Sequence, residues 1–183
     1  MSAGSRLLGL ENEDSDVDRL GVCIEPMKEA IGIQAPFEQW VDTQAQTTIY
    51  GLRKWMRLAL KGNPTILLPL WAPQEACEVR DALGQGLQAL APLIVSRQAA
   101  GPFLGYLQAQ RQRLTGERGQ MRVHRPDLVE KFGFDTKYAM HMLRLGLHGV
   151  ELLETGRLAL PMRPNDRYYL REVREGKVSI QEC

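Results

Sequence analysis

The sequence is poor in cysteine and has no long apolar run. Its three cysteines (Cys23, Cys77 and Cys183) form no CxxC pair and no even set for a disulfide framework, so we expect reduced thiols in a cytoplasmic protein. The longest apolar run, around 66–71, contains Pro69 and falls short of the roughly 20 residues that cross a bilayer. The first residues show no basic and apolar secretion leader, and we find no internal repeat. We therefore expect neither a membrane, a secreted nor a solenoid protein.

Neither sign of charge is in large excess. Lys plus Arg number 23 against 22 for Asp plus Glu, so overall charge points to no polyanionic partner. Any binding of nucleic acid would depend on a local basic patch. The 183 residues are 44% hydrophobic and 25% charged, which is ordinary for a globular chain of one domain, or of one domain with a small helical appendage.

The order of the predicted elements indicates an α+β fold, with a small sheet in front of a helical body. β-branched residues predict strands over 19–25 and 46–50. Apolar residues at helical spacing predict helices over 52–61, 74–90, 98–114, 135–154 and 166–174. Glycines and basic residues between Leu114 and Pro126 predict a loop, which is the best candidate for a seam between subdomains.

The first 18 residues hold the most informative pattern. Asp16 and Asp18 lie two apart at the entry to a predicted strand, where such side chains share a face. Two neighbouring carboxylates repel each other, and a divalent cation between them relieves the repulsion. Gly4 and Ser5 offer an open backbone and a hydroxyl, which suit a phosphate. The pattern predicts a metal–nucleotide site, and the alternative is a solvated acidic turn.

The predicted long helix carries a second group of polar residues. Lys137, His141, Arg144, His148 and Glu151 follow one another at spacings of four, three, four and three, so they form one stripe. The ordinary interpretation is a solvated helix face. Two histidines, a lysine and an arginine nevertheless differ from the Glu/Lys alternation of such a face. His148 and Glu151 alone are too few ligands for a metal site.

Basic residues gather in and around the predicted loop, and they suit either an RNA backbone or solubility. They are Arg111, Arg113, Arg118, Arg122, His124 and Arg125. A smaller group on the first long helix is another possible phosphate-facing surface, formed by Arg53, Lys54 and Arg57.

Several of these motifs together resemble a known family. One pattern resembles the signature of the DNA polymerase β nucleotidyltransferase superfamily. It consists of Gly4-Ser5, a spacer of ten residues, and Asp16-Val17-Asp18. More narrowly, the stretch 4–18 is similar to predicted nucleotidyltransferases associated with RNA repair (RlaP-type), found in bacteria and phages. Further stretches match in order over 50–64, 133–141 and 149–156, so the resemblance covers essentially the whole chain.

The resemblance implies a minimal polymerase-β-type fold in two parts. Residues 1–115 would form the nucleotidyltransferase α/β core with flanking helices, and residues 116–183 a helical subdomain facing the nucleotide. The implied activity is template-independent transfer of a nucleoside monophosphate from a triphosphate such as ATP, with Mg²⁺ or Mn²⁺, to an acceptor hydroxyl. The acceptor suggested by the family is an RNA 3′ end, as in tRNA repair, held by the basic loop over 111–125.

The resemblance also assigns roles to individual residues. Asp16 and Asp18 would be the catalytic metal ligands, one ion activating the attacking hydroxyl and the other holding the triphosphate. The implied nucleotide contacts are Gly4 and Ser5 with the triphosphate, Lys137, His141 and Arg144 with phosphates, and Asp135 with a sugar or base edge.

This sequence departs from the family pattern at the third carboxylate, where Gln46 stands. Glutamine is neutral and cannot act as a base, although its carbonyl can coordinate weakly. Asp42, four residues upstream, is a possible substitute, and a family glutamate aligns with Pro69. The alternatives are therefore a degenerate nucleotide-binding protein without turnover, or an enzyme that attaches nucleotides to a protein or a small molecule.

Overall fold

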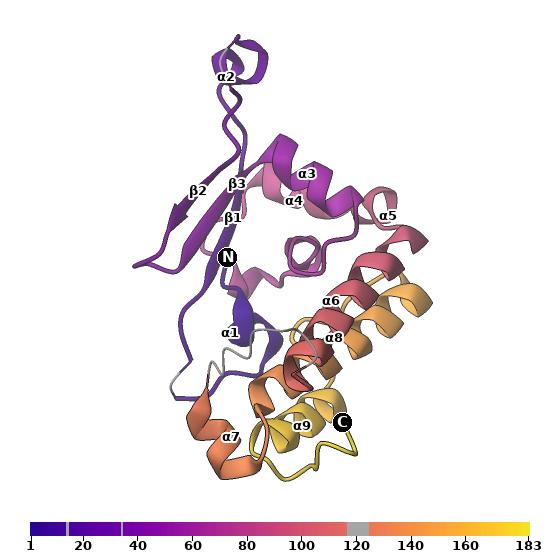
Figure 1. The fold of residues 1–183 in the computed structure, drawn as a ribbon. Helices are drawn as coiled ribbons and strands as arrows, with labels where there is room; N and C mark the ends of the chain where they lie inside the picture. Colours follow the sequence, from indigo (N-terminus) through magenta and orange to yellow (C-terminus); the bar gives the residue numbers. More distant parts are fainter. Residues whose placement is uncertain (14, 34, 117–124) are drawn as a thin grey trace. The chain divides into compact units, whose positions relative to one another are not determined.

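The computed structural model spans residues 1–183 and describes all of them except 14, 34 and 117–124 (Figure 1). The chain forms two compact units. Unit 1 comprises Met1–Ser96 and Ala159–Pro161, and unit 2 comprises Arg97–Leu158 and Met162–Cys183. The division of roles at residue 115 that the sequence suggests stays a prediction.

Unit 1 contains a mixed sheet of three strands, β1 (Arg19–Cys23), β2 (Gln39–Asp42) and β3 (Thr47–Gly51). Their order is β1-β3-β2, with β1 parallel and β2 antiparallel to the central β3. The expected α+β class is confirmed, and so are the strands expected over 19–25 and 46–50. Strand β2 was not expected. Its short, largely exposed sequence shows no alternation of apolar and polar residues.

Short helices and turns complete unit 1. Helix α2 stands at the tip of an arm that extends beyond the sheet (Figure 1). The helix expected over 52–61 is confirmed as α3, which buries Trp55 completely and ends before the left-handed Gly62. The elements are α1 (Gly4–Leu8), α2 (Met27–Ile31), α3 (Leu52–Leu60), η1 (Leu68–Trp71), η2 (Gln74–Ala76), α4 (Ala82–Ala89) and α5 (Ala91–Ile94).

The continuous helix expected over 74–90 is wrong. A short 3₁₀ turn, η2, is followed by non-helical residues, and α4 then begins after Asp81. The Asp81 carboxylate accepts a hydrogen bond of 2.9 Å from the N–H of Gly84, which is the geometry of an N-cap. Arg80 donates to Gln74 and Gln88, so the break is held on both sides. Apolar spacing had predicted one helix because it ignored this cap.

Unit 2 is helical in its described part. Helix α8 packs against both α6 and α9 (Figure 1). The helices expected over 98–114, 135–154 and 166–174 are confirmed with small shifts, whereas α7 was not expected. Most of the loop expected between 114 and 126 lies outside the described residues. The elements are η3 (Arg97–Ala99), α6 (Ala100–Leu114), α7 (Pro126–Phe132), α8 (Thr136–Thr155) and α9 (Pro164–Arg174).

Two glycines of α8 let it approach α6 closely. A β-carbon at Gly149 would lie 3.3 Å from the Phe103 ring, and one at Gly146 would lie 3.3 Å from Leu107. Phe103 is buried at this contact, so the helices are joined by dense apolar packing. Among the helices that the structure describes, none is long and apolar enough to span a membrane.

Candidate functional site

The glycine–serine motif and Asp18 lie together in unit 1. Gly4 has a φ of +58° at the start of α1, and the N–H of Ala3 donates to the backbone oxygen of Asp18 over 2.8 Å. The Asp18 carboxylate lies so close to Gly4 that a β-carbon at residue 4 would collide with it. The fold therefore brings together two motifs that the sequence separates.

The two aspartates differ in exposure. Asp18 is half-buried immediately before β1, whereas Asp16 is exposed in the preceding loop. The hydroxyl of Ser15 donates to the side chain of Asn12 over 2.6 Å, which holds this loop locally. Among the described residues, no group of three or more His, Cys, Asp or Glu side chains is placed to hold a metal ion. The contacts of the described residues therefore bring Asp18 to the glycine–serine turn, and the role of Asp16 as a metal ligand stays a prediction.

Gln46 lies beside Asp18. The backbone oxygen of Gln46 accepts a hydrogen bond of 2.8 Å from the N–H of Arg19, and Arg19 is opposite Thr47 in the parallel ladder. The preceding residues, Asp18 and Gln46, are therefore neighbours at the same edge of the sheet. Gln46 has a φ of 49°, which is uncommon for a residue other than glycine. The chain thus has a neutral amide at the position where the family resemblance expects the third carboxylate.

Asp42 takes part in the turn between β2 and β3, and its role as a substitute acid stays a prediction. Its carboxylate accepts hydrogen bonds of 2.9 Å from the N–H groups of Gln44 and Ala45. These bonds close the turn between β2 and β3, as an aspartate at the first position of a turn commonly does. Asp42 thus fixes the hairpin that carries Gln46.

The polar stripe of α8 is not a solvated face. His148 is 1% exposed, and Lys137, His141, Arg144 and Glu151 are at most partly exposed. The interpretation of this stripe as an ordinary solvent-facing surface is therefore wrong.

Burial keeps both histidines of the stripe neutral. It lowers the pKa of His148 to about 3, with a smaller effect from the positive charge of Arg144. It also lowers the pKa of His141 to about 3, and neighbouring positive charges, led by Arg144 and Lys137, act in the same direction. Burial lowers the pKa of Arg144 to about 10, so its guanidinium stays charged at neutral pH.

Asp135 holds the start of α8. One carboxylate oxygen accepts hydrogen bonds of 3.0 and 3.1 Å from the N–H groups of Lys137 and Tyr138, and the other accepts from Arg125 at 2.8 Å. The Arg125 guanidinium also lies 5.2 Å from the centre of the Tyr138 ring. With 7% of its surface exposed, Asp135 is a buried N-cap that pairs with the partly exposed Arg125. Its predicted contact with a sugar or base stays a prediction.

The whole chain matches one family model. The model is described as RlaP, an RNA repair pathway DNA polymerase beta family, and it matches residues 1–181. The chain belongs to the RlaP family. This membership indicates nucleotidyltransferase-type activity and confirms the resemblance drawn from the motifs. No curated protein and no solved structure matches the chain in the same comparisons.

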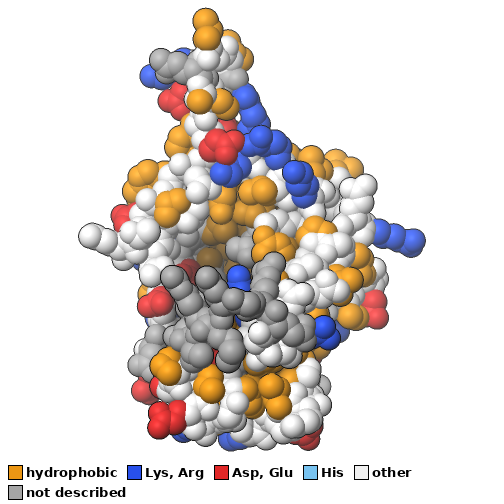
Figure 2. Space-filling view, viewed as in Figure 1, with side chains coloured by type: hydrophobic (Ala, Val, Ile, Leu, Met, Phe, Trp, Pro, Cys, Tyr) orange, Lys and Arg blue, Asp and Glu red, His pale blue; other side chains and the backbone are white. Residues whose placement is uncertain are grey.

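Basic residues form a second feature of this RlaP-family chain, on α3. Arg53 and Arg57 line a shallow groove with Leu52, Met56 and Leu60, and Figure 2 shows Lys and Arg side chains gathered there beside the arm. Lys54 and Arg57 of α3 both pair with Glu38, so part of this charge is neutralised. Of the basic loop, Arg118, Arg122 and His124 lie outside the described residues.

Sequence reasoning missed the basic residues that α9 contributes to unit 2. Arg174 is close enough to His141 for its charge to lower the pKa of that histidine, and Arg163 pairs with Glu151 at 3.0 Å. The spacing of the arginines along 163–174 was a usable signal, because Arg163, Arg167, Arg171 and Arg174 recur every three or four residues and so share one side of a helix. The sequence could not show that this side faces α8.

Proposed function

We propose that this RlaP-family chain transfers a nucleoside monophosphate from a nucleoside triphosphate to an acceptor hydroxyl, with Mg²⁺ held by Asp16 and Asp18. The observation that carries the proposal is the contact between the Asp18 carboxylate and the backbone of Gly4. A metal ligand and a phosphate-binding backbone need this proximity, because the cation must contact the phosphates it neutralises.

The residues present suit Mg²⁺ and a phosphate. Mg²⁺ prefers oxygen ligands, which Asp16 and Asp18 carry, and Gln46, whose side chain carries an amide oxygen, neighbours Asp18 at the same sheet edge. When bound, the cation would offset phosphate charge and orient the transfer. The missing side chain at Gly4 leaves room for the Asp18 carboxylate beside the backbone, and the Ser5 hydroxyl can donate to a phosphate. We assign the acceptor to RNA because the family is named for RNA repair.

Thermal unfolding with ATP and Mg²⁺ tests the nucleotide site. A ligand that binds only the folded chain stabilises it, by about 2.7 kcal/mol at a concentration 100 times Kd. Wild type should show a higher Tm, and the double variant Asp16→Asn/Asp18→Asn should show no increase. Glu11→Gln is the matched control, because Glu11 is an exposed acid of the same loop. An undiminished increase in the double variant would refute the metal assignment.

Labelled triphosphates in a cell extract test the acceptor. We expect label in material that a nuclease digests and a protease leaves intact. Label that only a protease releases would instead assign the chain to protein nucleotidylation. Label in a small soluble product would assign a small-molecule acceptor.

A degenerate nucleotide-binding protein is the second candidate. It is supported by Gln46, which occupies the position beside Asp18 where a third carboxylate would stand. The described residues also contain no cluster of three metal-ligating side chains. Such a protein would bind the nucleotide and Mg²⁺ without turnover.

Restoring the acid separates the two candidates. Gln46→Asp adds a carboxylate, and Gln46→Asn is the neutral control, because Asp and Asn both tolerate the left-handed backbone found at this residue. If wild type and Gln46→Asn incorporate no label while Gln46→Asp does, the chain is a degenerate binder. If wild type incorporates label, it is an enzyme with a two-carboxylate site.

A further inference from the structure

The arm between β1 and β2 carries large apolar side chains that the described part of the chain leaves exposed. It comprises residues 24–33 and 35–38, with α2 at its tip, and Figure 2 shows hydrophobic side chains at its end. Ile24 is 59% exposed, Met27 73% and Ile31 78%, and Ile33 is fully exposed. A contiguous apolar patch of this kind is rare on a monomer and marks an interaction surface.

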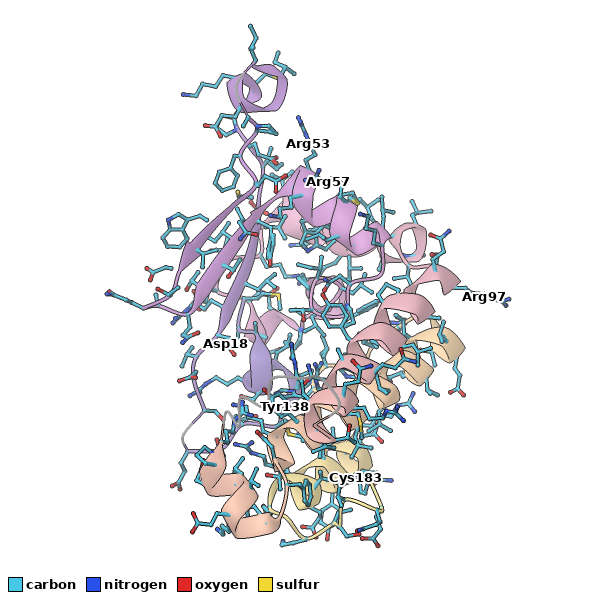
Figure 3. All side chains as sticks on the ribbon, in the orientation of Figure 1. Asp18, Arg53, Arg57, Arg97, Tyr138 and Cys183 are labelled. Atoms are coloured by element: carbon cyan, nitrogen blue, oxygen red, sulfur yellow. The ribbon has the colours of Figure 1, made fainter. Side chains whose placement is uncertain are left out.

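The shallow groove of α3 lies at the root of the same arm, and both belong to unit 1. Its apolar lining consists of Leu52, Met56 and Leu60, which recur every four residues and so share one side of the helix. Arg53 and Arg57 also line the groove, and Figure 3 shows them beside the root of the arm. Its volume of about 450 Å³ is large enough for a few apolar side chains.

The apolar residues of α2 match the groove in their spacing. Met27 and Ile31 stand four residues apart, so they lie on one side of the helix, as the apolar residues of α3 do. The tip of the arm extends away from the groove at its own root (Figure 1). The groove that the tip can fill is therefore that of another copy.

The charges of the tip and of the groove are complementary. Lys28 and Glu29 of α2 carry one charge of each sign. The groove also carries both signs, because Glu25 lines it together with Arg53 and Arg57. A tip that enters the groove can therefore set its lysine against a carboxylate and its glutamate against a guanidinium, which gives the contact specificity.

A two-fold axis midway along the arm satisfies both halves of this match at once. The apolar helix stands at the tip of the arm and the groove at its root. Two arms that lie side by side and antiparallel place each tip at the root of the other. Such a contact is isologous, since each copy offers the same two surfaces.

We propose that this chain forms a two-fold dimer in which the arm of each copy fills the α3 groove of the other. Four apolar side chains supply about 240–480 Å² of buried area, at roughly 60–120 Å² for each. A stable complex buries about 800 Å² on each partner, which exceeds what an arm supplies alone. The two-fold arrangement approaches that area, because each copy buries both an arm and a groove. The dimer does not rest on the function proposed above.

Light scattering during size-exclusion chromatography tests the dimer on the full chain. Across the micromolar range, wild type should have twice the mass of one chain. Ile31→Lys brings a cation to the groove arginines, and Leu60→Glu places a charge among the apolar residues of the groove, so each variant should be monomeric. A monomeric wild type, or a dimer that persists in both variants, would overturn the proposal.

Val79→Lys is the matched control, because Val79 is 81% exposed and lies at the other end of β1 from the arm. Its neighbour Glu78 pairs with Arg19 at the start of β1, whereas the arm follows the end of that strand. This variant should remain a dimer. All three substituted side chains are at least half exposed, so each variant should keep the helical circular dichroism of wild type. A monomeric Val79→Lys would mean that added charge alone separates the copies, and the arm would lose its assignment.

Mixing the two monomeric variants tests which surfaces meet. In a mixed dimer, one contact joins an unchanged arm to an unchanged groove. The other contact sets the lysine introduced at residue 31 against the glutamate introduced at residue 60, so their charges attract. Ile31→Lys and Leu60→Glu should therefore form a dimer together although neither does so alone. A mixture that stays monomeric would refute the pairing of arm with groove.

Discussion

At the scale of single residues, Gly4 is constrained by its backbone and by its neighbour. Its φ of +58° is left-handed, and the Asp18 carboxylate occupies the place where a β-carbon would stand. Gly4→Ala should therefore abolish the increase in Tm with ATP and Mg²⁺. It should also lower the free energy of unfolding by about 1–2 kcal/mol, the cost of left-handed backbone in an L-residue.

Gly156 provides the control for this substitution. It is also left-handed, with a φ of +70°, but a β-carbon there would meet nothing within 4 Å. Gly156→Ala should lose similar stability and keep the full response to ATP and Mg²⁺. Equal loss of the response in both variants would mean that backbone strain, and not contact with Asp18, is responsible.

The buried histidines predict how stability depends on pH. The pKa of His148 is about 3 in the folded chain and near 6.5 when unfolded, so between these values the unfolded chain binds a proton that the folded chain does not. The full contribution to stability is present above pH 6.5 and is lost as the pH falls towards 3, by at most about 1.4 kcal/mol per pH unit. Urea unfolding of His148→Gln between pH 4.5 and 7.5 should show a shallower decline than wild type. An equally steep decline would show that His148 is not the titrating group.

Residues of the candidate site were predictable to different degrees. Gly4 stands at one end of the family signature over 4–18, and Asp16 and Asp18 stand at the other, so the sequence alone makes all three candidates. Arg174 could not be assigned, because only the packing of α9 on α8 places it near His141.

At the scale of elements, the contact between α6 and α8 depends on the small size of Gly149. A larger side chain there would press on Phe103, since even a β-carbon lies 3.3 Å from its ring. Gly149→Leu should lower the free energy of unfolding by about 1–3 kcal/mol, the usual cost of overpacking. Gly105 is an exposed residue of α6, and a β-carbon there would meet nothing within 4 Å. Gly105→Leu should instead raise the free energy of unfolding by up to about 1 kcal/mol, because leucine favours a helix more than glycine does. Chemical denaturation measures both, and equal effects would contradict this account of the packing.

Helices with regular apolar spacing and clear ends were predictable, as α3 and α8 show. Asp135 begins α8 and Gly156 ends it, so local signals agreed with packing. The break before α4 was missed because Asp81 was not weighed as an N-cap, although its residue type permits it. Helix α7 was missed despite Pro126 at its start and Gly133 at its end, because it buries little apolar surface.

At the scale of the whole molecule, the chain leaves unit 1 after Ser96 and returns to it for Ala159–Pro161. Such a short return carries no signal of composition or periodicity, so the sequence could not predict it. Leu158 and Met162, which flank the return, are buried at 3% and 2% exposure and belong to unit 2. If unit 2 unfolds, residues 159–161 of unit 1 therefore lose the buried flanking residues that anchor them.

Tryptophan fluorescence can test this coupling, because the chain has three tryptophans and all of them (Trp40, Trp55 and Trp71) lie in unit 1. Gly149→Leu destabilises unit 2, and we expect it to lower the urea midpoint of the tryptophan signal together with that of the helical circular dichroism. The two signals should keep coincident midpoints. A tryptophan midpoint equal to that of wild type would show that the units unfold independently.

The sheet order has a consequence for the timing of biosynthesis. The central strand β3 is the last of the three to be synthesised, and β1 has no ladder partner until β3 arrives. Asp18 therefore gains its neighbour Gln46 only once the nascent chain has emerged beyond Gly51. A stalled ribosome carrying a shorter product would hold Asp18 without the strand that brings Gln46 beside it, so the proposed Mg²⁺ site could form only after β3 is complete.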